Sequence, residues 1–80
     1  MEFIGEYLKS IRVESRYDIS TVAKELKIGK DILTSIESDN FPKHLGSVYL
    51  IGHLRAYSKF LKLDEDEIVE KFKIQTLYDD

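Results

Sequence analysis

The chain has 80 residues, no cysteine, 34% charged residues and a formal net charge of −3, values that fit one small globular domain. The lack of cysteine excludes a disulfide framework and a thiolate metal site. No apolar run approaches the roughly 20 residues that span a bilayer, and the N-terminus has an early acid instead of the basic segment of a signal peptide. We therefore expect a cytoplasmic domain.

The spacing of apolar residues predicts helices and no strand in the first half of the chain. A first helix covers residues 3–14. A second follows Ser20, whose hydroxyl is suited to capping free backbone N–H groups, and ends at Lys27. Gly29 is expected to form the next turn because glycine accepts a positive φ. A third helix covers residues 30–38.

Two more helices are predicted in the second half. The residue before Pro42 disfavours the α region, so residues 39–46 are expected to connect to a fourth helix over 47–62. Asp64, with Glu67 three places later, has the pattern of a capping box that opens a fifth helix. The predicted fold class is all-α, a five-helix repressor-like domain over residues 1–73 with an acidic tail at 74–80.

The second and third helices have the spacing of a helix-turn-helix motif. In a DNA-binding domain of this kind, residues at the start of the third helix meet base edges; here these are Lys30, Thr34 and Ser35. Residues 29–41, however, carry one base and three acids (Asp31, Glu37 and Asp39). Because nonspecific DNA affinity depends on neutralising phosphates, we expect DNA binding to be unlikely and keep a transcriptional regulator as the alternative function.

The fourth helix is apolar over more of its circumference than a small bundle needs. At 100° per residue, one stripe is suited to the core and a second lies about a quarter turn away; the core stripe contains Leu50, Leu54, Tyr57 and Leu61, and the second stripe contains Tyr49, His53, Ala56 and Phe60. One stripe seals a core, so the second predicts a partner protein. Gly52, which costs a helix about 1 kcal/mol, is expected to mark the close approach of another backbone.

The charge distribution adds to this picture. Residues 42–63 contain no acid and carry a net charge of +4, whereas residues 1–41 carry −2 and residues 64–80 carry −5. The pattern predicts a local basic surface rather than a general affinity for polyanions. Lys43 and Lys59 belong to this segment and join the predicted partner-binding residues.

The helix-turn-helix, the Asp-Asn-Phe-Pro loop and the run from Val48-Tyr49 through Gly52 to Leu54-Arg55-Ala56-Tyr57 resemble the cytoplasmic domain of the RodZ family. That resemblance implies an adaptor that binds the bacterial actin-like filament protein MreB and links it to the membrane and the cell-wall machinery. It places filament contacts at Tyr49 and at His53, where the family usually has Phe or Tyr. It also implies a membrane anchor in a longer parent protein, so the domain would be tethered to the inner membrane.

Other chemistry has little support. His44 and His53 have no third ligand at a useful spacing, so no metal site is predicted. The acids of residues 64–67 lack the spaced ligands and central glycine of a calcium loop. No nucleophile stands beside an evident base, and no glycine-rich phosphate loop is present. We expect no cofactor and no enzymatic activity.

Overall fold

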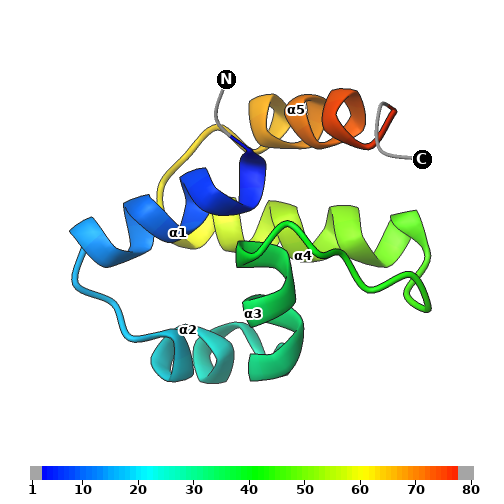
Figure 1. Cartoon of the computed structure of the whole chain (residues 1–80). Coiled ribbons are helices and arrows are strands. Elements are labelled where there is room, and N and C mark those ends of the chain that lie inside the picture. Colours follow the sequence, from blue (N-terminus) through cyan, green and yellow to red (C-terminus); the bar gives the residue numbers. More distant parts are fainter. Residues whose placement is uncertain (1–2, 78–80) are drawn as a thin grey trace.

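The computed structural model describes residues 3–77 as five α-helices without a strand, so the predicted all-α class is confirmed (Figure 1). The helices are α1 (Ile4–Glu14), α2 (Ile19–Leu26), α3 (Lys30–Glu37), α4 (Ser47–Phe60) and α5 (Glu65–Leu77). Within that part of the chain, no helix is long and apolar enough to cross a membrane.

The ends of α2 differ in detail from the prediction. Asp18, not Ser20, is the N-cap, and its side chain accepts a hydrogen bond from the Ser20 backbone N–H at 3.1 Å. The helix closes at Lys27, which adopts the left-handed conformation with φ 56°. Gly29 has φ −57° and precedes α3 in an extended conformation. The expected positive φ of Gly29 is therefore wrong, because the chain reverses two residues earlier, directly after Leu26.

The start of α5 has the aspartate cap of the predicted capping box, whereas the Glu67 side chain pairs with Lys71 instead of completing the box. Asp64 Oδ1 accepts hydrogen bonds from the backbone N–H groups of Asp66 (3.0 Å) and Glu67 (3.3 Å). The Glu67 carboxylate pairs with Lys71 one turn later at 3.2 Å, an i,i+4 contact on the surface of the same helix. The aspartate therefore satisfies the first N–H groups of α5.

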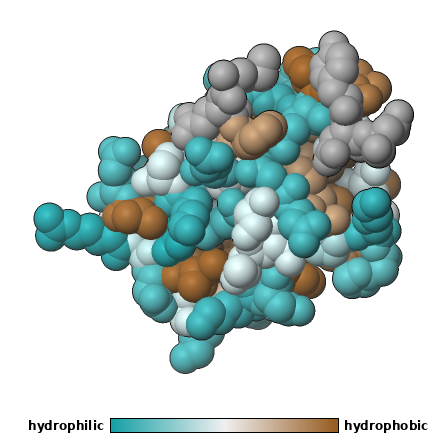
Figure 2. All heavy atoms as spheres, viewed as in Figure 1, coloured by the Kyte–Doolittle hydropathy of each residue, from teal (hydrophilic) through white to brown (hydrophobic). Residues whose placement is uncertain are grey.

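The core lies where the apolar faces of the helices meet. α4 packs against α5, while α1 contacts both α3 and α5, and α2 packs on α3 (Figure 1). Among the described residues, the buried hydrophobic cluster draws on every helix; it contains Ile4, Leu8, Val22, Ala23, Ile28, Leu33, Ile36, Leu50, Leu54, Tyr57, Leu61, Ile68 and Phe72. On the face in Figure 2, hydrophilic side chains separate several small apolar patches.

The Asp39 side chain, just after α3, forms hydrogen bonds to both α1 and α5 beside the N-terminus of α1. Its carboxylate accepts hydrogen bonds from the backbone N–H groups of Gly5 (2.7 Å) and Glu6 (3.2 Å), and from the side-chain amide of Gln75 (2.9 Å). Gln75 in turn accepts one from the Ile4 N–H at 2.8 Å. Because Gln75 belongs to this network and α5 continues to Leu77, the domain boundary predicted at residue 73 falls inside a packed helix. Residues 78–80 lie outside the described residues.

Candidate functional site

The side chains of α4 separate into the two predicted stripes. Leu50, Leu54, Tyr57 and Leu61 are buried, as expected for the core stripe. In the second stripe, Tyr49 is 68% exposed, whereas His53, Ala56 and Phe60 are half-buried. Phe60 packs against the core, as its position at the far end of the stripe allows. The second stripe is thus most open at its N-terminal end.

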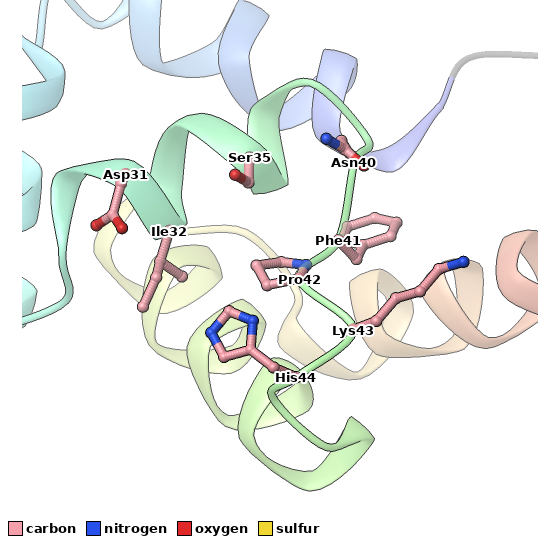
Figure 3. Close-up of a pocket in the computed structure, with 8 residues that line it drawn as sticks. All are labelled: Asp31, Ile32, Ser35, Asn40, Phe41, Pro42, Lys43 and His44. Carbon is pink, nitrogen blue, oxygen red and sulfur yellow. The ribbon is translucent and has the colours of Figure 1, made fainter.

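The predicted partner-binding residues are only partly gathered in one place. Tyr49 and His53 lie one helical turn apart on the second stripe. Lys43 is exposed in the loop before α4, and its side chain extends away from Pro42 and His44 (Figure 3). Lys59 is on the side of α4 that meets α5, where its ammonium group lies 3.4 Å from a Glu65 carboxylate oxygen. Lys59 is therefore placed for the α5 contact more than for the second stripe.

Arg55 pairs with the acids at the start of α5. Its guanidinium donates hydrogen bonds to Asp66 at 2.8 Å and to Glu65 at 2.9 Å. These bonds, the one to Asp66 first, raise the pKa of Arg55 above its ordinary value. The acidic run after residue 63 is accounted for by this contact and by the cap of α5. No group of three or more metal-ligating side chains occurs among residues 3–77.

Gly52 does not mark a close backbone contact. It is exposed on α4, and a Cβ atom added there would meet nothing within 4 Å. The expectation from the sequence was therefore wrong, because no other part of the described chain packs on α4 at this position. The glycine in which space is tight is Gly5, where an added Cβ would lie 2.0 Å from the Ile36 carbonyl oxygen.

The outer surface of α3 is less acidic than its sequence indicates. Glu37 is buried, and Asp39 is occupied at the N-terminus of α1. Of the three acids counted between residues 29 and 41, only Asp31 remains on the exposed start of α3, beside Lys30. The predicted local charge of −2 on the recognition surface is therefore wrong, and that surface is close to neutral. Thr34 is exposed with its hydroxyl bonded to the Lys30 carbonyl at 2.8 Å, and Ser35 is half-buried.

A buried polar network joins α1, α3 and α4. Arg12 donates two hydrogen bonds to the Glu37 carboxylate, at 2.7 Å from Nε and 3.0 Å from Nη2, and the Tyr57 hydroxyl donates a third. Burial and the bond to Glu37 raise the pKa of Tyr57, and the bond to Glu37 raises the pKa of Arg12. The Tyr57 hydroxyl therefore ends on this carboxylate inside the fold.

Sequence reasoning missed the network, although one signal was present. Glu37 stands four residues after Leu33, so the two side chains share a face of α3. An acid on a buried face requires a cationic or hydrogen-bonding partner. Nothing in the local pattern of α1 identified Arg12 as that partner.

A small open pocket lies between α3 and the loop that follows it (Figure 3). Its volume is about 260 Å³, below the roughly 300 Å³ at the low end of small-molecule sites. Eight residues line it: Asp31, Ile32, Ser35, Asn40, Phe41, Pro42, Lys43 and His44. Its size suits one side chain of a partner better than a substrate.

Comparison with known proteins supports the helix-turn-helix assignment. The chain is 31% identical over 62 residues to an uncharacterized protein of Haemophilus influenzae, a match that covers 76% of this chain and 20% of that relative. No solved structure matches the chain. The family described as helix-turn-helix domain matches residues 7–68, which include α2, α3 and α4. The chain therefore belongs to the helix-turn-helix domain family.

Proposed function

We propose that this domain is a non-enzymatic adaptor that binds the bacterial actin-like filament protein MreB, as in the RodZ family that it resembles. The proposal rests chiefly on Tyr49. This side chain is 68% exposed at the start of α4 and contributes nothing to the buried cluster. Tyrosine supplies a large apolar ring with few torsions to immobilise, and it is enriched among residues that dominate binding energy.

The charge around Tyr49 supports a partner with acidic edges. Residues 42–63 contain no acid, and Lys43 is exposed in the loop that leads into α4. A cation at the edge of an apolar contact attracts a partner of opposite charge and steers its approach. We expect the filament protein to present an apolar hollow bordered by carboxylates.

The second part of the proposal is a link to the membrane. In a longer parent protein, a segment beyond this domain would tether it to the inner membrane, so that the filament is coupled to the cell-wall machinery that maintains cell shape. The full reading frame tests this part: a stretch of about 20 apolar residues downstream of Asp80 would support it. A downstream segment without such a stretch would contradict it.

Co-sedimentation with polymerised MreB tests the filament contact. Tyr49→Ala should weaken binding about thirtyfold, since truncating a hot-spot aromatic costs about 2 kcal/mol or more. Val48→Ala is the matched control, because Val48 is 83% exposed on the same turn but points about 100° away round the helix. Neither change should lower the melting temperature. Equal affinities for the two variants, or no co-sedimentation of the unaltered chain, would refute the contact.

A DNA-binding regulator remains the second candidate, and one observation favours it. Because Glu37 is buried and Asp39 is bonded to the N-terminus of α1, the exposed start of α3 keeps only one of the three acids, Asp31, that would repel phosphate. The same surface has no net positive charge, and phosphate contacts supply most nonspecific affinity. We therefore expect no stable complex in an electrophoretic shift at low salt. A salt-sensitive complex that is lost in Lys30→Glu would favour the regulator.

A further inference from the structure

We propose that Tyr17, in the turn between α1 and α2, belongs to the same partner-binding surface as Tyr49. The surface would then run the length of the second stripe of α4 and end on an aromatic pair formed by Tyr17 and Phe60. This inference rests on the proposed filament contact and adds its second anchor. Nothing in the helical pattern of α4 points to Tyr17, because the residue lies on a different part of the chain.

The contact between the two rings connects Tyr17 to the stripe. Their centroids are 4.9 Å apart and their planes are tilted by 57°, an arrangement typical of favourable aromatic pairs. Phe60 is half-buried against the core, whereas Tyr17 remains 40% exposed. Tyr17 therefore packs on Phe60 and still leaves part of its own side chain at the surface.

The backbone of Tyr17 is held firmly. Its N–H donates to the Arg12 carbonyl at 3.1 Å, and the Arg16 N–H donates to the Val13 carbonyl at 3.0 Å, the bond pair of a Schellman motif. Arg16 has φ 62°, the left-handed conformation that this motif requires. The Arg12 guanidinium also donates to the Tyr17 carbonyl at 2.8 Å while it is paired with Glu37. The ring is thus carried by a fixed turn, which reduces the ordering cost of binding.

The dimensions and charge of the surface indicate its occupant. Tyr49 and Phe60 are eleven residues apart, about 16 Å along a helix. A stable interface covers about 800 Å² per partner, or about 30 Å across, so one tyrosine at one end of α4 cannot supply it alone. An anchor at each end of α4 suits such a footprint better. The occupant should be a folded protein surface, the filament protein, with an apolar centre and an acidic edge that complements Lys43 near the Tyr49 end.

The test measures MreB filament affinity for Tyr17→Ala, Tyr17→Phe and Leu77→Ala. We expect Tyr17→Ala to weaken binding about tenfold, while Tyr17→Phe stays close to the unaltered chain because it keeps the ring. Leu77→Ala is the matched control, an exposed apolar side chain on α5, away from the Tyr17–Phe60 pair. Thermal melts confirm that each variant is folded.

A second measurement needs no substitution. Hydroxyl-radical labelling followed by mass spectrometry should show Tyr17 and Tyr49 both protected when the chain is bound to filaments, and Leu77 unprotected. If Tyr49 is protected and Tyr49→Ala weakens binding while Tyr17 stays reactive and Tyr17→Ala behaves like Leu77→Ala, the inference is wrong and the filament contact stands. If no variant changes affinity and neither tyrosine is protected, both proposals fail.

Discussion

Replacing Glu37 with alanine removes the acceptor of three hydrogen bonds inside the fold, two from Arg12 and one from Tyr57. The side chains of Arg12 and Glu37 are only 11% and 4% exposed, and Tyr57 is fully buried. The variant therefore leaves a guanidinium and a phenol without their partner in a place that water hardly reaches. Breaking a buried ion pair in this way costs about 3–5 kcal/mol.

That cost is large for a domain of this size. At about 0.05–0.15 kcal/mol per residue, 80 residues have a free energy of unfolding of about 4–12 kcal/mol. A loss of 3 kcal/mol lowers the melting temperature of such a domain by at least about 12 °C. Urea denaturation and thermal melts followed by circular dichroism measure both quantities. Glu25→Ala, at an exposed acid on α2, is the matched control and should change stability by no more than about 0.5 kcal/mol.

A combined variant separates the loss of a contact from the burial of unpaired groups. Arg12→Met, Glu37→Leu and Tyr57→Phe together replace the network with apolar side chains of similar size. Because a buried ion pair is often no better than such a replacement, we expect the combined variant to be much more stable than Glu37→Ala. The reasoning is refuted if the free energy of unfolding of Glu37→Ala lies within about 1 kcal/mol of that of Glu25→Ala.

Three further predictions concern other positions. Gly5→Ala should destabilise the fold by about 1–3 kcal/mol, because its Cβ would lie 2.0 Å from the Ile36 carbonyl oxygen. Gly52→Ala, at an open position on α4, should stabilise the fold by up to about 1 kcal/mol. Equal effects of the two substitutions in chemical denaturation would contradict this difference in space. The pKa of Tyr57 is raised in the folded chain, so the contribution of Tyr57 to stability is complete below about pH 10. Above that pH, this contribution decreases by up to about 1.4 kcal/mol per pH unit. Urea titrations at alkaline pH should show a smaller decrease for Tyr57→Phe than for the unaltered chain. If His53 docks against the filament through its ring, His53→Phe should strengthen binding, because it adds apolar area at the contact. An unchanged filament affinity for His53→Phe would remove His53 from the interface.

The amino-acid pattern by itself determined the class of fold and the approximate extent of each helix. The apolar residues of α1, α3 and α4 recur at helical spacing, and this regularity is local, so it can be read along the chain. The same local signal separated the buried stripe of α4 from the second stripe, which is exposed at Tyr49 and half-buried beyond it. It also placed the cap of α5 at Asp64, because a cap acts on N–H groups only two or three residues away.

The tertiary structure alone decided which polar residues meet. Asp39 caps a helix that begins 35 residues earlier in the chain, and Glu37 faces Arg12 across 25 residues. Such contacts depend on how whole helices pack, and no periodicity encodes them. This matters for function, because Glu37 and Asp39 make the α3 segment acidic in sequence but form hydrogen bonds to α1 in the fold. In the same way, only the packing of the α1–α2 turn on α4 brings Tyr17 to Phe60, because side chains distant in sequence share a surface only after the helices have packed together.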